Sequence, residues 1–294
     1  YRLSQQTTHN WGEPYYMNSK AKSEGFSISA DANTGIYYMW ENFLNFNKTF
    51  ASVHNVNAMA GMSFTENSSD NVSASASGSN IMNSYKDNYR YVSQVNKNPE
   101  TSRNIGNQPS LHRNMSYFGR LGYSFNDRYN LQFILRADAF DTSKLDKDHR
   151  WGKFPSVSAG WTISNEDFIR NNISSDILSY MKLRASWGRN GNISVLSGYP
   201  YKTGISENSK YYQSDNGLII NGSAPSGVAN PDLTWETSDQ IDLGMDFRFL
   251  ANRLSLGIDY YNKKTKDLLF GITTPSEAGS LNTTINGGEI LNTG

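Results

Sequence analysis

The residue types that most often carry chemistry are sparse and scattered in this sequence. The chain contains no cysteine, which removes thiol catalysis, disulfides and cysteine-based metal centres. Its histidines lack the His-Glu-x-x-His spacing or any short-spaced pairing of a zinc site; they are His9, His54, His112 and His149. The aspartates of residues 141–149 lack the ligand spacing and the glycine of an EF-hand loop. The sequence therefore predicts no metal site and no cofactor.

Motifs of well-known catalytic mechanisms are also missing. There is no Gly-x-Ser-x-Gly nucleophile elbow and no paired-carboxylate signature. The stretch GRNGN at residues 188–192 matches neither the dinucleotide-binding fingerprint nor a phosphate-binding loop. We therefore expect the protein not to be an enzyme.

The dominant pattern of the sequence is a two-residue alternation of apolar and polar side chains. Odd positions of residues 241–249 are apolar, and the even positions are polar or glycine. Residues 254–260 are apolar at even positions, and the four-residue turn between them keeps both apolar rows on one side. Such a hairpin suits a membrane β-barrel with lipid on one face and water on the other, and it also suits a soluble β-sandwich.

Four hairpins of this kind follow one another, and long polar stretches separate them. The expected strand pairs are 38–46 with 56–64, 121–125 with 131–137, 157–163 with 183–187, and 241–249 with 254–260. We expect no regular element in the polar residues 1–35, and long polar connections at roughly 67–114, 141–153, 191–237 and 271–284. Short and long connections thus alternate, which places all tight turns at one end of an antiparallel sheet. This segregation is typical of outer-membrane barrels and favours a barrel over a sandwich.

Composition limits the partners of the protein. The chain has 27 basic and 27 acidic side chains, so no net charge favours nucleic acid binding. No segment has the apolar length of a membrane helix, but a barrel strand needs only about 9–11 alternating residues.

Several segments resemble one known family, and they follow the same order along the chain. They are SYFGRLGYSFNDRYNLQFILRAD, RWGKFPSVSAGWTISNEDFI, MKLRASWGRNGN and NPDLTWETSDQIDLGMDFRFLANRLSLGIDYYNKKTKDLL, and they occur in the order found in SusC/RagA-like TonB-dependent outer-membrane transporters. The resemblance extends from about residue 40 to the end. It implies an all-β fold, an antiparallel transmembrane β-barrel portion with short periplasmic turns and long extracellular loops. This portion would supply about 9–10 strands of a barrel of about 22.

The resemblance also implies a domain organisation. Residues 1–294 would form part of a single TonB-dependent receptor barrel domain. We expect the N-terminal plug, the TonB box, the signal peptide and the last strands to lie outside this sequence.

The implied function is active import of glycans, oligosaccharides or peptides across the bacterial outer membrane. The implied partners are outer-membrane lipid, a SusD-like surface lipoprotein, the TonB complex acting through the missing N-terminal part, and the oligosaccharide or peptide cargo. Two alternatives remain open at this stage. The first is a TonB-dependent receptor for a metal chelate or vitamin, and the second is a secreted β-sandwich glycan-binding module.

Candidate site residues fall into two groups. Aromatic rings stack on the C–H faces of sugars, so we expect loop tyrosines to contact cargo or, alternatively, to pack against neighbouring loops or the SusD-like lipoprotein. These are Tyr199, Tyr201, Tyr211 and Tyr212. The second group belongs to the most recognisable family motifs and is expected to be structural, because proline, glycine and turn-forming Asn or Asp shape the entry to a strand. It consists of Asn230, Pro231, Asp232, Trp235, Trp151, Gly152 and Pro155.

Overall fold

The computed structural model is built almost wholly of β-strands. It describes residues 1–294 except 13–14, 19–21, 24–25, 79–101, 213–218 and 279–280. The strands of the first half are β1 (Arg2–Gly12), β2 (Tyr15–Tyr16), β3 (Lys22–Ser23), β4 (Phe26–Phe50), β5 (His54–Gly78), β6 (Ser102–Asn107), β7 (Ser110–Phe125) and β8 (Tyr129–Phe140). The later strands are β9 (Trp151–Thr162), β10 (Leu178–Asn192), β11 (Ile205–Tyr212), β12 (Ile219–Pro225), β13 (Glu236–Phe249), β14 (Leu254–Thr273) and β15 (Asn282–Thr293). The short helical elements are η2 (Ile163–Asn165), α2 (Asp167–Arg170) and η3 (Ser276–Ala278).

Eleven strands form one antiparallel sheet. Its order is β1-β4-β5-β7-β8-β9-β10-β13-β14-β15, and β6 pairs with β5 beside this path. Neighbouring strands in this order also follow one another in the sequence, apart from the strands outside the path. This is the arrangement expected for successive hairpins. Among the described strands, β1 and β15 end the order without pairing to each other, so the sheet is open. The chain divides into two compact units, residues 1–40 with 65–113 and residues 41–64 with 114–294.

The first unit corrects the expectation that residues 1–35 are irregular. β1 pairs with β4 from Arg2 opposite Tyr37 to Gly12 opposite Ser27. β5 also extends to Gly78, well into the stretch expected to be a polar connection, and there it pairs with β6. Apolar alternation stops in these segments, but backbone hydrogen bonding continues, because a strand with polar side chains on both faces is stable where both faces meet water. The sheet therefore has more and longer strands than the alternation predicts.

The second unit confirms the predicted hairpins. Leu131 lies opposite Ala159, Trp161 opposite Leu183, and Ala185 opposite Leu243, so apolar residues of successive strands form continuous rows. We call the side that carries these rows the apolar face and the opposite side the polar face. Large side chains on the apolar face remain open, with Leu131 52% exposed, because no other part of the described chain covers them.

The height of the apolar face agrees with a membrane. The five apolar residues of β13 extend from Ile241 to Phe249. Nine residues at about 3.3 Å each reach about 30 Å, and the usual strand tilt of about 35–45° reduces this to about 21–25 Å, close to the roughly 25 Å height of the apolar band of a membrane barrel. Beyond Ile241 the same face becomes polar, with Asp239 bonded to Arg189 of the neighbouring strand.

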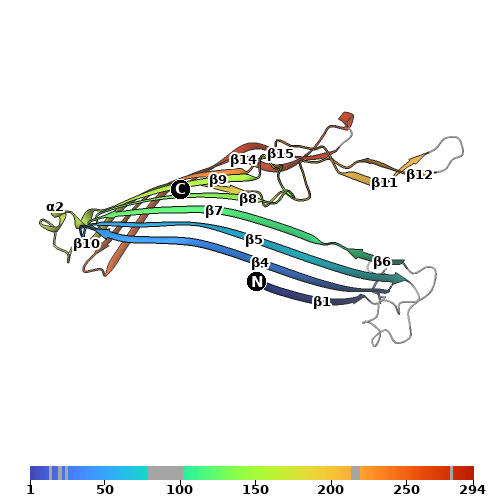
Figure 1. Cartoon of the computed structure of the whole chain (residues 1–294), viewed down its shortest axis with the longest axis horizontal. Coiled ribbons are helices and arrows are strands. Elements are labelled where there is room, and N and C mark those ends of the chain that lie inside the picture. The colour runs from blue at the N-terminus through green and yellow to red at the C-terminus, as the bar shows by residue number, and fades with distance from the viewer. Residues whose placement is uncertain (13–14, 19–21, 24–25, 79–101, 213–218, 279–280) are drawn as a thin grey trace. The chain divides into compact units, whose positions relative to one another are not determined.

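Tight turns and long connections of the second unit separate by end (Figure 1). β7 and β8 are joined by residues 126–128, a three-residue turn rather than the five-residue turn expected, and β13 and β14 by residues 250–253. The β9–β10 connection contains η2 and α2, and it lies at the same end as the β7–β8 turn. We call this the turn end, and the opposite end, with the long connections, the loop end. No helix in the described part of the chain is long and apolar enough to cross a membrane.

The loop end contains a small hydrophobic core, which we call the loop core. It consists of Leu145, Ile193, Leu196, Leu233 and Leu269, with Phe140 and Trp235 packed against it. Leu145 and Leu233 are fully buried. The connections that the sequence marks only as long and polar therefore bury apolar side chains, and residues 191–237 also contain the β11–β12 hairpin.

Candidate functional site

The polar face carries charged groups that pair across strands. The guanidinium of Arg184 donates from Nε to Oδ2 of Asp246 at 2.7 Å and from Nη2 to Oδ1 of Asp259 at 2.9 Å. Its two cross-strand neighbours are glycines, Gly160 and Gly244. A Cβ atom at Gly244 would lie 2.8 Å from Cζ of Arg184, so the missing side chain leaves the room that the guanidinium fills.

A polar pocket of about 410 Å³ lies on this face. Its lining includes the polar side chains of Asn57, Gln132, Ser158, Lys182, Ser186 and Asp242. Ser186 donates to Asp242 at 3.3 Å, and Gln240 donates to the other carboxylate oxygen at 2.8 Å. Amides, hydroxyls and charges of both signs suit a hydrated surface that binds polar groups. The described residues contain no group of three or more His, Asp or Glu side chains that could hold a metal ion.

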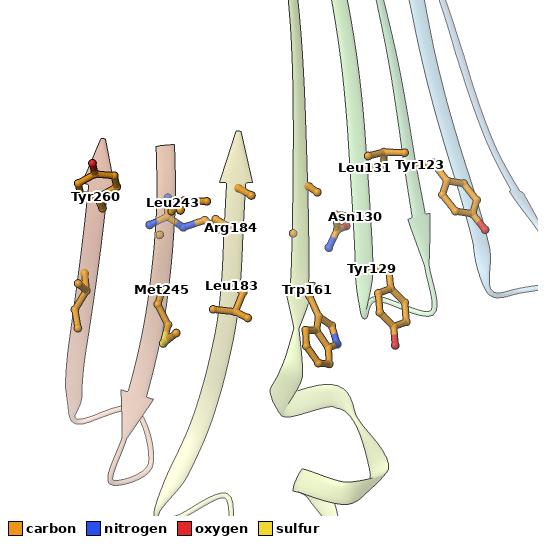
Figure 2. Close-up of a pocket in the computed structure, with 15 residues that line it drawn as sticks. Tyr123, Tyr129, Asn130, Leu131, Trp161, Leu183, Arg184, Leu243, Met245 and Tyr260 are labelled. Carbon is orange, nitrogen blue, oxygen red and sulfur yellow. The ribbon is translucent and has the colours of Figure 1, made fainter. Parts of the chain in front are cut away.

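The apolar face has a hollow of its own, which we call the apolar groove. It has a volume of about 730 Å³ and extends from Tyr123 of β7 to Tyr260 of β14. Figure 2 shows Tyr129 and Trp161 side by side at its margin, next to the helical connection. The sheet therefore has a polar pocket on one face and an apolar groove on the other.

At the turn end, one carboxylate joins two connections of the sheet. Glu166, which is buried, accepts hydrogen bonds from the hydroxyl of Tyr129 at 2.6 Å and from Nε1 of Trp161 at 3.0 Å. Its other oxygen accepts from Nη1 of Arg128 at 3.1 Å, and Arg128 also contacts Asp167. The hydrogen bond from Tyr129 is the main reason that the pKa of Glu166 lies below its ordinary value of 4.5, with Trp161 next. We call these residues the Glu166 clamp.

At the loop end, Trp235, one of the expected structural residues, packs against the loop core. The indole of Trp235 donates to the carbonyl of Arg150 at 3.2 Å and meets the ring of Phe154 edge to face, with centroids 5.3 Å apart. A Cβ atom at Gly152 would collide with the ring of Phe154, and so would one at Gly191. A larger residue at either position would force the ring of Phe154 to move, because the two rings occupy the space of a side chain.

The turn residues of the NPDLTWE motif connect the loops to β15. Asn230 donates from Nδ2 to the carbonyl of Thr284 at 2.8 Å, and its Oδ1 accepts from the amide of Asp232 at 3.3 Å. The carbonyl of Pro231 lies 3.2 Å from Nδ1 of His149. The motif therefore connects segments that are distant in sequence.

The remaining motif residues lie in β9. Trp151 begins the strand, and its ring stacks on that of Tyr117 with centroids 5.9 Å apart. The buried Ala139 is the direct partner of Trp151 in the neighbouring strand. Pro155 lies opposite Leu135. Both positions contribute to the sheet.

The candidate tyrosines differ in their surroundings. Tyr201 is only 8% exposed and donates its hydroxyl to the carbonyl of Thr142 at 2.6 Å, whereas Tyr199 is 47% exposed. Their ring centroids are 6.2 Å apart, and the ammonium of Lys202 lies 5.1 and 5.3 Å from the two rings. Tyr211 and Tyr212 lie in β11, but their side chains are outside the described residues.

Sequence reasoning missed the Glu166 clamp and the aliphatic part of the loop core. A weak signal for the clamp existed, because Tyr129 and Trp161 each lie at a strand end beside a short connection that contains charged residues. Leu145 and Leu233 gave no signal, since each is an isolated apolar residue in a polar stretch and they are 88 positions apart.

Comparison with known proteins identifies the family. The family model described as TonB dependent receptor-like, beta-barrel, matches residues 1–294. TonB-dependent receptor P39 of Formosa agariphila is 32% identical over 269 residues, which are 89% of this chain and 23% of that protein. TonB-dependent receptor SusC of Bacteroides thetaiotaomicron is 37% identical over 161 residues, which are 55% of this chain and 16% of that protein.

A solved structure agrees with this assignment. The structure described as "Structure of the RagAB peptide transporter" matches with a TM-score of 0.80 and 25% sequence identity, over 99% of this chain and 30% of that one. The chain spans a quarter or less of the length of the curated relatives named above. It belongs to the TonB-dependent receptor β-barrel family, in its SusC/RagA-like branch, and forms part of an outer-membrane β-barrel.

Proposed function

We propose that the full-length protein imports oligosaccharides or peptides actively across the outer membrane. The observation that carries this proposal is the two-faced sheet, with an exposed apolar face about as tall as the apolar band of a membrane barrel and a polar face of paired charges. In a closed barrel the apolar face meets lipid and the polar face lines the lumen. The family match over residues 1–294 excludes the soluble β-sandwich alternative.

The energy source and the partners form part of the same proposal. A relative is named as a TonB-dependent receptor, and the matching solved structure is a peptide transporter. We propose that the TonB complex drives transport through a segment outside this chain, that a SusD-like lipoprotein covers the extracellular mouth, and that the protein is not an enzyme.

Of the two candidate tyrosines whose side chains the structure describes, Tyr199 is the better placed to touch cargo. Its ring is half exposed, while the buried hydroxyl bond of Tyr201 fixes the neighbouring ring. A sugar or a peptide side chain stacked on Tyr199 would gain an aromatic contact next to the cation of Lys202. Contact by Tyr211 and Tyr212 remains a prediction from the sequence.

Uptake by whole cells tests the proposal. The gene for the full-length protein would be deleted and restored, and entry of fluorescent oligosaccharides, peptides, a ferric chelate and a vitamin would be measured with and without a protonophore. We expect uptake of oligosaccharides or peptides that requires both the gene and the proton gradient. Gene-dependent uptake that is unaffected by the protonophore would show passive diffusion, and uptake of only the chelate or the vitamin would establish the alternative receptor.

Variants of Tyr199 test the site. Tyr199→Ala removes the stacking surface, and we expect about tenfold weaker apparent affinity for cargo, corresponding to about 1.4 kcal/mol. Tyr199→Phe keeps the ring and serves as the matched control, with affinity near that of the wild type. Equal affinity of all three proteins would remove Tyr199 from the site without affecting the transport proposal.

A further inference from the structure

The turn that carries Tyr199 holds its backbone in a strained conformation. Gly198 and Tyr199 both have positive φ, 63° and 60°. Glycine adopts this left-handed region freely, whereas a tyrosine does so at a cost, and residues kept in it are concentrated at ligand sites and other functional positions. Most other non-glycine residues with positive φ in the described chain lie in the tight hairpin turns, where the geometry of the turn demands it. The strain at Tyr199 thus falls on a residue whose ring is available to a ligand.

Hydrogen bonds fix this turn to two other segments of the loop end. The amide of Tyr199 donates to the carbonyl of Ser143 at 2.8 Å, and the amide of Asn230 donates to the carbonyl of Pro200 at 3.3 Å. Within the turn, the amide of Lys202 donates to the carbonyl of Tyr199 at 2.9 Å. The turn is therefore positioned before any ligand binds, so little affinity is lost to the ordering of the loop.

Lys202 brings a positive charge to this fixed turn. Its ammonium lies over the rings of Tyr199 and Tyr201, which attract a cation through their π-electrons. The rings are neutral, so the positive charge is not compensated, and among the residues that the structure describes no carboxylate forms an ion pair with it. In contrast, Arg184 on the polar face contacts two aspartates. The exposed ammonium of Lys202 can therefore accept an anionic group from outside the chain.

Two charged residues of the segment that holds this turn are engaged in their own surroundings. Asp141 directs Oδ1 toward the amide of Ser143 at 2.7 Å. Lys144 donates from Nζ to the carbonyl of Ile193 at 3.2 Å, which ties it to the loop core. Lys202 is thus the charged group that lies beside the exposed ring.

A flat exposed ring next to an ammonium selects for one kind of chemical group. A sugar ring or a peptide unit stacked on Tyr199 places its substituents near Nζ of Lys202, which is 5.1 Å from the centroid of that ring. A carboxylate at this position forms a charge-assisted hydrogen bond, and a neutral hydroxyl or amide forms a weaker one. The turn belongs to the loop end, which is the extracellular end of the barrel, so it can meet cargo from outside (Figure 1).

We propose that the turn of residues 198–202 is a subsite for carboxylate-bearing cargo, in which Tyr199 stacks on the cargo and Lys202 binds its carboxylate. The proposal rests on the import function proposed above and makes it more specific, because it sets the charge of the cargo. The carboxylate belongs to a uronic acid or to an acidic peptide, and matched probes distinguish these two sources.

Uptake of matched probes by cells that express the full-length protein tests this proposal. One set contains uronic acid oligosaccharides and their methyl esters, and the other contains glutamate peptides and the same peptides with glutamine, all with amidated C-termini. We expect about fivefold higher apparent affinity for the acidic members of the transported set, the upper end of the range for exposed ion pairs. Equal affinities, or a preference for the neutral members, would overturn the subsite alone. Absence of gene-dependent uptake of every probe would overturn the import function and the subsite together.

Variants of Lys202 locate the bound carboxylate. Lys202→Gln removes the charge and keeps a polar side chain, so acidic and neutral probes should have equal affinity. Lys202→Glu should reverse the preference, and Lys202→Arg should restore most of it. Lys147→Gln removes an exposed lysine from another connection of the loop end and should keep the preference of the wild type. A preference that survives in Lys202→Gln, or that is lost equally in Lys147→Gln, would contradict the assignment.

Ionic strength provides a measurement that does not depend on any substitution. Salt screens an exposed ion pair but has little effect on stacking against a ring. The preference of the wild type for acidic probes should therefore shrink as the NaCl concentration rises, while the affinity for neutral probes stays nearly constant. A preference that does not change with salt would overturn the role of Lys202. Only variants whose heat-modifiable gel migration shows an assembled barrel would be compared.

Discussion

The two ends of the same strands are held in different ways. At the turn end, the three-residue β7–β8 turn and the short helical segment of the β9–β10 connection meet at a buried carboxylate that accepts three hydrogen bonds. At the loop end, long connections bury Leu145 and Leu233 completely and pack Trp235 against Phe154. The β7–β8 turn at residues 126–128 has no apolar side chain to bury, so polar bonds position it, whereas a long connection can supply a core of its own.

This difference predicts unequal sensitivity to substitution. Truncating a leucine in a buried core costs about 2–5 kcal/mol, whereas one hydrogen bond contributes only about 0.5–1.5 kcal/mol. Substitutions at the loop end should therefore destabilise the protein more than substitutions at the turn end.

The largest effect is expected from Leu233→Ala at the loop end. The side chain is fully buried, so its truncation should destabilise the loop core by about 2–5 kcal/mol. Hydrogen exchange measures this locally at the amides of Leu196 and Tyr199, which are bonded to the carbonyls of Ile193 and Ser143. Val228→Ala, in the same connection but 41% exposed, should change exchange little. Equal protection in both variants would mean that the loop core does not hold the loops.

The next effect tests the ring packing above the two glycines. Gly191→Ala places a methyl group against Phe154 and Trp235, and overpacking of this kind costs about 1–3 kcal/mol. The unfolding midpoint in urea of the full-length protein in lipid vesicles would be measured. Gly271→Ala is the matched control, because its Cβ would meet only an ordinary contact at 3.9 Å. If both alanine variants have the same unfolding midpoint, the rings of Phe154 and Trp235 move aside at a lower cost than their packing indicates.

At the turn end, Glu166→Gln should remove a dependence of stability on pH. The pKa of Glu166 is lowered in the folded protein, so this group stabilises the fold above its ordinary pKa of 4.5, and the contribution is lost as pH falls below 4.5 through the folded value. The wild type should therefore lose more stability on acidification in that window than Glu166→Gln, whose amide oxygen still accepts the bonds from Tyr129 and Trp161.

The pH experiment has a control in the same connection. Asp176→Asn removes a carboxylate that is not part of the Glu166 clamp, and its pH profile of the unfolding midpoint should follow the wild type. Parallel profiles of Glu166→Gln and the wild type would show that the clamp does not depend on the charge.

The smallest effect is expected in the β13–β14 turn. Leu250, Ala251 and Asn252 all have positive φ, a conformation that favours glycine. Backbone bonds from Leu250 and Ala251 to the β9–β10 connection hold this turn. Ala251→Gly relieves strain but adds freedom to the unfolded chain, so we expect a gain in the free energy of unfolding of less than about 1 kcal/mol.

A control of opposite sign sharpens this last comparison. Ala137→Gly lies within β8, where the backbone is extended, and it should lower the free energy of unfolding by about 0.5–1 kcal/mol. A loss of similar size in both variants would show that the left-handed turn stores no strain.

Much of the fold follows from the sequence alone. The period of two in residues 241–260 fixes which side chains share a face, since the geometry of a strand is local. Whether a hairpin turn has an odd or an even number of residues decides which side chains of its two strands share a face. The sequence predicts a five-residue turn after Phe125, and the structure has a three-residue turn at 126–128. Both numbers are odd, so the predicted faces were correct. The tight turns and the SusC/RagA-like motifs could be recognised in the sequence for the same reason, because they too are local.

Other features depended on partners that are distant in the sequence. Residues 2–12 form a strand because β4 supplies a partner for their backbone, although their side chains show no alternation. Glu166 is placed 37 positions from Tyr129 and Leu145 is placed 88 from Leu233, so neither contact leaves a local pattern. The apolar groove requires Ala159 and Ala185, two small residues of its lining, to be in register across β9 and β10.

The sequence by itself determined the strands of the apolar face, their sides and the alternation of short and long connections, because these properties depend on neighbours along the chain. Only the tertiary structure decided where the strands continue into polar segments, which carboxylate joins the turns and which isolated leucines form the loop core. These features are set by register between strands, and register sums many weak backbone and side-chain contacts that no single segment contains.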